Sequence, residues 1–127
     1  MTRTPINGRT LAEAWTLEGK DGEGRPLRLL FSEQELAHSD LGIVVGRHPD
    51  LCDRVIDDPS ISRRHFRVSV KEGGLRLEDL NALNGTLLDG RPLPPFQAQS
   101  LRPGQVLVLG RVFLEIRETQ LDGQVPR

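Results

Sequence analysis

The chain has 127 residues, of which 36% are hydrophobic and 28% are charged, a balance typical of a single folded domain. Its formal net charge of −1 argues against general nucleic-acid binding, which depends on a surplus of lysine and arginine. Cys52 is the only cysteine, so an intrachain disulfide is excluded. No apolar run approaches the length of a membrane span, and the first ten residues lack the apolar core of a secretory signal. We therefore expect a soluble, cytoplasmic protein.

Turn-forming residues divide the chain into short segments. Thirteen glycines and nine prolines are many for this length, and they favour short strands over long helices. We expect flexible tails at residues 1–12 and 119–127, with one folded domain at residues 13–118 between them. Within the domain, residues 14–17 and 27–31 flank a loop that contains three glycines, and this pattern predicts a first β-hairpin.

The middle of the domain contains one short helix signal and three strand signals. Ser32 and Glu35 form a capping-box pattern, but no amphipathic helix follows it, so we expect one helical turn at most. Residues 43–45 form a continuous β-branched run, which is typical of a strand buried on both faces. Residues 66–70 alternate strictly between apolar and polar, and residues 75–78 alternate again after a Gly-Gly turn.

Two further hairpins are expected in the last third of the domain. The Asp-Gly pair at residues 89–90 is a strong turn signal between residues 87–88 and 91–93. Residues 106–109 and 112–116 flank a Gly-Arg turn and predict a final hairpin. Short strands with regular turns between them, and no sustained helical period, predict an all-β sandwich or barrel.

Three polar loops stand at the ends of predicted strands, at residues 46–48, 60–65 and 81–86. Together they supply guanidinium groups, a hydroxyl and a carboxamide. Arginine makes bidentate contacts with phosphate, serine donates short bonds to an oxyanion, and asparagine bonds to main-chain amides. The combination predicts a cradle for an oxyanion on a ligand that also needs positioning.

A catalytic interpretation would use Ser62 as nucleophile and His65 as base. The two residues are three apart at the entry to a strand, and an odd separation in extended chain directs side chains to opposite faces. No Gly-x-Ser-x-Gly elbow surrounds the serine. We therefore expect no enzymatic activity, and we interpret His65 as a packed histidine whose ring nitrogens connect loops.

A metal site would draw on His48, Cys52 and His65, joined by nearby aspartates. Structural zinc sites favour paired cysteines, and a second cysteine is absent. The aspartates before Pro59 are better explained as turn formers. We expect neither a metal nor any other cofactor.

A nucleic-acid surface would depend on a group of four arginines, at positions 47, 63, 64 and 67. Few aromatic residues accompany them for base stacking, and the segment 75–78 supplies a compensating acidic residue, Glu78. We therefore expect no nucleic-acid partner, and no membrane partner either.

The three loops, in this order and spacing, resemble those of the forkhead-associated (FHA) domain. The matching text is Gly46-Arg47 after the β-branched run, Ser62-Arg-Arg-His65, and Asn84-Gly-Thr86 after Leu77-Glu-Asp-Leu80, with Asp-Gly closing the next turn. The resemblance covers about residues 14–117. It implies a sandwich of two twisted, mostly antiparallel sheets of the FHA and SMAD type, with about eleven strands, that binds phosphothreonine peptides.

The resemblance also implies roles for individual residues. Four positions match phosphopeptide-binding residues of the family: Arg47, Ser62, Arg63 and Asn84. Four others match positions that shape the loops: Gly46, His65, Gly85 and Thr86. The expected partner is a phosphothreonine-containing protein, either a Ser/Thr protein kinase or one of its substrates.

One position departs from the family pattern. Leu83 precedes the asparagine, where the family frequently has a serine or threonine that contributes to the phosphate site. The change removes a potential donor, so the alternative function is a phosphate-independent interaction scaffold of the same fold. A further hypothesis is that a phosphorylated threonine of the N-terminal tail (Thr2, Thr4 or Thr10) occupies the site in cis.

Overall fold

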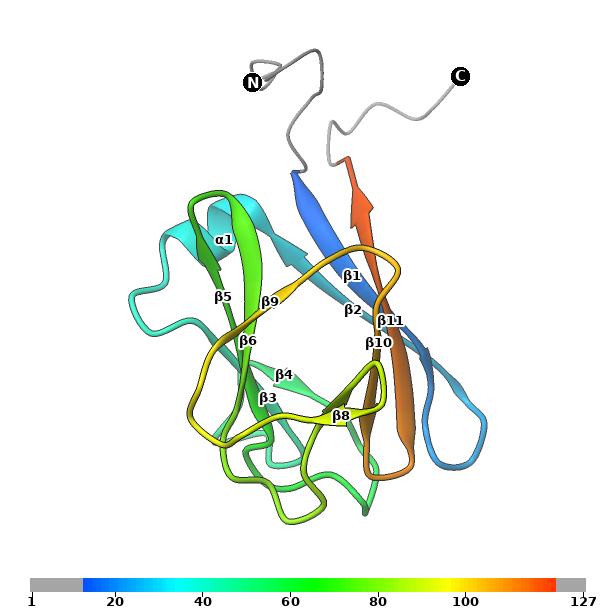
Figure 1. The fold of residues 1–127 in the computed structure, drawn as a ribbon. Coiled ribbons are helices and arrows are strands. Elements are labelled where there is room, and N and C mark those ends of the chain that lie inside the picture. Colours follow the sequence, from blue (N-terminus) through cyan, green and yellow to red (C-terminus); the bar gives the residue numbers. More distant parts are fainter. Residues whose placement is uncertain (1–12, 121–127) are drawn as a thin grey trace, which may run out of the picture.

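The computed structural model describes residues 13–120, which form two facing β-sheets and one short helix (Figure 1). The expected tails at 1–12 and 119–127 lie outside the described residues except for Thr119, which belongs to the last strand, and Gln120; the hypothesis on tail threonines lies outside them as well. One sheet has six strands in the order β2-β1-β11-β10-β7-β8, and the other has five in the order β4-β3-β5-β6-β9. The predicted all-β sandwich of mostly antiparallel strands is confirmed, with β3–β4 as the parallel exception. The elements are β1 (Ala14–Lys20), β2 (Pro26–Ser32), α1 (Glu33–Ala37), β3 (Ile43–Gly46), β4 (Arg54–Val55), β5 (Phe66–Lys71), β6 (Gly74–Asp79), β7 (Leu87–Leu88), β8 (Arg91–Pro92), β9 (Gln99–Leu101), β10 (Val106–Leu109) and β11 (Val112–Thr119).

The hairpins expected from the turn residues are all present, and the helix is as short as its sequence predicts. Strands β1 and β2 pair along their whole length, from Ala14 opposite Ser32 to Lys20 opposite Pro26. Ser32 caps α1 by accepting a hydrogen bond from the Glu35 N–H at 3.0 Å, as the capping-box pattern indicates. Asp89-Gly90 connects β7 to β8, and Gly110-Arg111 connects β10 to β11.

The prediction that residues 43–45 are buried on both faces is wrong. Ile43 and Val45 are buried in the core, whereas Val44 is half-exposed on the outer face of the five-stranded sheet. Val44 lies opposite Arg67 in the β3–β5 ladder. In an antiparallel sandwich one face of each sheet meets solvent, so a β-branched run can occupy a half-buried strand.

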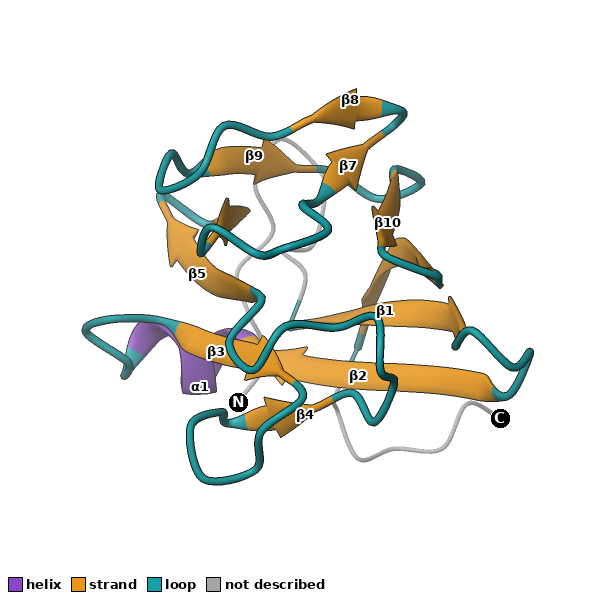
Figure 2. Ribbon diagram, turned by 90° about the horizontal axis from the view of Figure 1, so that it is seen from below, coloured by secondary structure: helices purple, strands orange, loops and turns teal. Residues whose placement is uncertain are grey.

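The core between the sheets is made by apolar side chains that alternate along the longer strands. Phe31, Phe66, Leu77 and Leu114 are fully buried there, together with Trp15, the only tryptophan. The opposite side chains of β2, β5, β6 and β11 are partly or fully exposed, whereas residues 14–17 of β1 are buried on both faces. This rigid sandwich holds the loops that follow β3, β4 and β6 (Figure 2).

Those loops lie together at one end of the molecule, at the bottom of Figure 1. The start of β1 and the end of β11 lie next to each other, where Ala14 pairs with Thr119. In Figure 1 that pair is at the opposite end from the loops. The three polar loops of the sequence therefore form one surface, well separated from the point where the described chain begins and ends.

Candidate functional site

The end of β3 is joined to the β4–β5 loop by main-chain hydrogen bonds. The Arg47 N–H donates to the Ser62 carbonyl at 3.0 Å, and the His48 N–H donates to the Arg63 carbonyl at 3.2 Å. Gly46 makes this approach possible, because a Cβ atom at that position would lie 2.3 Å from the Arg63 carbonyl oxygen. The glycine thus brings Arg47 and Ser62, fifteen residues apart in sequence, to the same place.

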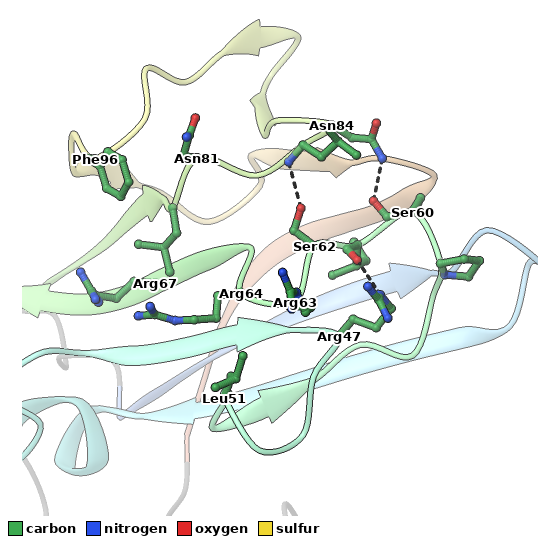
Figure 3. Close-up of a pocket in the computed structure, with 14 residues that line it drawn as sticks. Arg47, Leu51, Ser60, Ser62, Arg63, Arg64, Arg67, Asn81, Asn84 and Phe96 are labelled. Carbon is green, nitrogen blue, oxygen red and sulfur yellow. Dashed lines mark hydrogen bonds between the residues drawn. The ribbon is translucent and has the colours of Figure 1, made fainter.

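The Arg47 side chain is fixed along one edge of its guanidinium. Its Nε–H donates to the Ile61 carbonyl at 2.9 Å (Figure 3). No other hydrogen bond or ion pair joins the guanidinium to a described residue, and Arg47 lines the pocket. An arginine held at Nε with its Nη groups free is prepared for a bidentate contact with an oxyanion.

Ser62 and Asn84 connect the second and third loops while each keeps one polar function free. The Ser62 hydroxyl oxygen accepts from the Leu83 N–H at 2.9 Å, so its own O–H remains available to donate. The Asn84 Nδ2 donates to the Ser60 carbonyl at 2.8 Å, which leaves the Oδ1 oxygen as an acceptor (Figure 3). One donor and one acceptor therefore remain for a ligand between the loops.

His65 is fully buried directly beneath these loops. Its Nδ1 accepts a hydrogen bond from the Ser62 N–H at 3.1 Å, and its Nε2–H donates to the Gly85 carbonyl at 2.8 Å. This pattern requires the neutral ring with the proton on Nε2. Burial lowers the pKa of His65, and the hydrogen bond to Gly85 opposes that effect only in part.

We predict from this geometry that stability falls when the pH drops below about 6.5, the ordinary pKa of histidine. The unfolded His65 takes up a proton there while the folded ring stays neutral, so acid favours the unfolded state. The slope is at most about 1.4 kcal/mol per pH unit. Urea unfolding from pH 7 to 5, followed by Trp15 fluorescence, measures it. The less stable His65→Gln variant is expected to lose this slope, and an unchanged slope in that variant would contradict the assignment.

A buried carboxylate under the second loop connects three separate turns. Asp58 is 1% exposed and accepts from the Gly22 N–H at 2.7 Å and from both the N–H and hydroxyl of Ser60 at 2.9 and 2.6 Å. The Ser60 hydroxyl oxygen in turn accepts from the Arg111 N–H at 2.8 Å. Burial alone would raise the pKa of Asp58, but the hydrogen bonds from Ser60 and Gly22 outweigh it and hold the pKa below its usual range. From its position before Pro59 in the sequence, Asp58 is predicted only to form a turn.

A second buried carboxylate organises the third loop. Asp79 accepts from the Thr86 hydroxyl at 2.6 Å and from the N–H groups of Asn81 and Ala82 at 3.0 and 3.3 Å. Gly85 has a φ of 70°, a left-handed conformation that favours glycine. The family resemblance pointed to Gly85 and Thr86, but it assigned no role to Asp79.

The pocket between the loops is open and has a volume of about 840 Å³. All four predicted phosphopeptide-binding residues, Arg47, Ser62, Arg63 and Asn84, line it. Two arginines that carried no predicted role in binding, Arg64 and Arg67, line it as well, and no acidic residue does. Leu83 lies at the rim with 92% of its surface exposed.

Two alternatives considered from the sequence, a nucleophile–base pair and a metal site, find no matching geometry in residues 13–120. The Ser62 hydroxyl does not bond to the His65 ring, whose contact is with the Ser62 main chain, so the two do not form a nucleophile–base pair. No group of three or more His, Cys, Asp or Glu side chains in the described part of the chain could hold a metal ion. The only described helix, α1, is far too short and polar to cross a bilayer.

Comparisons with known proteins agree with the geometry. The family model of the FHA domain matches residues 43–110. The oxoglutarate dehydrogenase inhibitor of Corynebacterium glutamicum is 35% identical over 69 residues, which are 54% of this chain and 46% of the inhibitor, so the match spans less than half of that relative. An FHA domain solved for its phosphothreonine-dependent interactions is 29% identical with a TM-score of 0.62, covering 85% of this chain and 99% of that one. The FhaA FHA domain in complex with the intracellular domain of Rv3910 is also 29% identical, with a TM-score of 0.60 and coverage of 81% and 99%.

Proposed function

This chain belongs to the FHA family, and on that basis we propose that it binds phosphothreonine in partner proteins and so joins them in cytoplasmic Ser/Thr kinase signalling. The observation that carries the proposal is the convergence of Arg47, Ser62, Arg63 and Asn84 on one open pocket that no acidic residue lines. The likeness to an FHA domain with phosphothreonine-dependent interactions supports it. The chain acts as a binding module with no chemistry of its own and no cofactor.

Each of the four side chains has a proposed task. The Nη groups of Arg47 donate hydrogen bonds to two phosphate oxygens. The Ser62 O–H donates to one of these oxygens or to the third oxygen of the phosphate. Arg63 is exposed without an ion-pair partner among the described residues, and it lines the same pocket and adds a second positive charge for the phosphate. The Asn84 Oδ1 accepts a main-chain N–H of the peptide next to the phosphothreonine. Gly46, His65, Gly85 and Thr86 keep these four in place.

The partner is a phosphorylated protein of a Ser/Thr kinase pathway, either a kinase or a kinase substrate. The complex of the FhaA domain with the intracellular domain of Rv3910 supports a protein partner of this kind. A second candidate function, phosphate-independent protein binding at the same pocket, is favoured by Leu83 alone. Its exposed apolar side chain takes the place of a phosphate-binding hydroxyl at the rim.

Fluorescence anisotropy with labelled degenerate peptides tests the proposal. One pool carries a fixed phosphothreonine, the second phosphoserine and the third unphosphorylated threonine. We expect the first pool to bind most tightly, the second about tenfold more weakly because it lacks one methyl group, and the third not measurably. Equal binding of the first and third pools would reject phosphate recognition and establish the second candidate function.

A further inference from the structure

The pocket continues beyond the four residues with proposed phosphate and main-chain contacts. At the end opposite Ser60 and Asn84 it is lined by Leu51, Arg64, Arg67 and Phe96, which we call the arginine–phenylalanine end (Figure 3). Leu51 lies in the β3–β4 loop, Arg64 at the end of the β4–β5 loop, Arg67 near the start of β5 and Phe96 in the β8–β9 loop. Nothing in the proposed phosphate contact uses them.

The two arginines of this end have unused hydrogen-bonding capacity. Arg67 lies on the outer face of β5, and its contact with Glu78 is a single long one, 3.4 Å from Nη1 to Oε1. Its Nε is buried and has no acceptor among the described residues. Arg64 is exposed and forms no ion pair with a described residue. The Arg76 Nε, outside the pocket, is buried without an acceptor in the same way, so the donors that a ligand can use are the Nη2 group of Arg67 and the guanidinium of Arg64.

The positive charges that line the pocket indicate that its ligand is negatively charged. Four arginines line the pocket, and among the described residues only Arg67 of these four forms an ion pair, with Glu78. A phosphothreonine brings between one and a half and two negative charges, roughly enough for the corner formed by Arg47 and Arg63. The remaining positive charge at Arg64 and Arg67 is complementary to a carboxylate on the same peptide.

Phe96 shows that this end is also built for an apolar contact. Its side chain is 63% exposed, and Leu51 is 48% exposed. The φ angle of Phe96 is 62°, a left-handed conformation that is strained for a bulky residue. Two prolines directly precede it, and its N–H donates to the Asp79 carbonyl at 2.8 Å, so a stiff loop holds the strained residue in place. Strain of this kind persists mainly where a surface must present a particular side chain.

We propose that the arginine–phenylalanine end is a second subsite that selects among phosphorylated partners. It takes an acidic side chain flanking the phosphothreonine between Arg64 and Arg67, with an apolar side chain of the same peptide against Phe96. The subsite rests on the proposed function, because the phosphate anchors the peptide that reaches it. Its ligand is therefore a phosphothreonine segment with a mixed acidic and apolar flank.

The test is an aspartate scan of one phosphothreonine peptide over four positions on each side, followed by a leucine scan of the best binder. We expect aspartate at one or two positions on one flank to tighten binding about three- to tenfold. A leucine next to that aspartate is expected to increase the affinity further by a smaller factor, which we call the leucine gain. Arg64→Gln is expected to reduce the ratio between the aspartate and asparagine peptides to near one.

The Phe96→Asn variant separates a binding role from a structural one. Asparagine tolerates the left-handed conformation, so we expect the melting temperature to rise by about 2–5 °C while the leucine gain disappears. Phe113→Asn is the matched control, because Phe113 is 52% exposed on β11 in the other sheet and does not line the pocket. It is expected to leave the leucine gain unchanged.

The outcomes keep the two proposals apart. If phosphothreonine is required but no flanking aspartate improves binding, the second subsite is rejected and the proposed function stands. If heparin competes as well as the aspartate peptide and Arg64→Gln affects both equally, the arginines are a general anion surface and the second subsite is rejected too. If phosphate is dispensable, both proposals fall.

Discussion

Replacing Arg47 with alanine is expected to weaken binding of a phosphothreonine peptide by about 30- to 150-fold, which corresponds to about 2–3 kcal/mol. The loss is large because the guanidinium is already held by its Nε–H bond to the Ile61 carbonyl, so little side-chain entropy opposes the contact with phosphate. Isothermal titration calorimetry of wild type and variant with one phosphorylated peptide measures it. The unphosphorylated peptide should bind both proteins equally weakly.

Two further substitutions make the Arg47 result specific. Arg47→Lys keeps the positive charge but loses the Nε–H donor and the fork geometry, so its affinity is expected to lie between those of wild type and Arg47→Ala. Arg91→Ala removes an exposed arginine of β8 that does not line the pocket, and it should change the affinity less than twofold. If Arg91→Ala weakened binding as much as Arg47→Ala, the phosphate would be attracted by overall charge and not by this corner.

The chain's turn residues made most of the strands predictable. Glycine pairs and Asp-Gly mark the hairpins, and strict alternation marks which side chains of β5 and β6 are buried. Two short strands, β4 and β9, carry no such signal. Residues 54–55 and 99–101 become strands only because β3 and β6 offer them free edges. Pairing of this kind is determined by the tertiary structure and not by local sequence.

The candidate site was predictable in part because several residues that line its pocket lie next to strand ends. Gly46-Arg47 and Asn84-Gly85 are recognisable as short motifs, and the structure brings both to one pocket. Asp58 and Asp79 could not be assigned in the same way. Each is a buried acceptor for main-chain N–H groups, and one donor to Asp58 is the N–H of Gly22, 36 residues earlier. Every residue except proline has a main-chain N–H, so the sequence does not show which of these groups donate to an aspartate.

The position of Phe96 in the pocket was also not predictable from the sequence. In the sequence it is an aromatic residue after two prolines, in a loop with no predicted partner. Only the main-chain bond to the Asp79 carbonyl brings it beside Arg67 and the end of β6. A single sequence does not report a contact between loops that are both irregular.

Replacing Asp79 with alanine is expected to lower the free energy of unfolding by about 3–5 kcal/mol. The variant leaves the Thr86 hydroxyl and the N–H groups of Asn81 and Ala82 without an acceptor in a site where the carboxylate is 2% exposed. Urea unfolding followed by the fluorescence of Trp15, which is 3% exposed, measures the loss. Glu78→Ala, one residue earlier and only half-buried, should cost less than about 1 kcal/mol.

Thr86→Val separates the side-chain partner of Asp79 from its main-chain partners. The substitution keeps the shape and removes the hydroxyl, so it is expected to cost about 1–2 kcal/mol. The double variant with Asp79→Ala should cost less than the sum of the two, by about 1 kcal/mol, because both remove the same 2.6 Å hydrogen bond.

The Asp79 carboxylate also orders the loop that presents Asn84. Phosphopeptide affinity of Asp79→Ala should therefore be lower than that of wild type at temperatures where the variant is still folded. Additive costs with unchanged affinity would show that Asp79 stabilises the sandwich without shaping the binding loop.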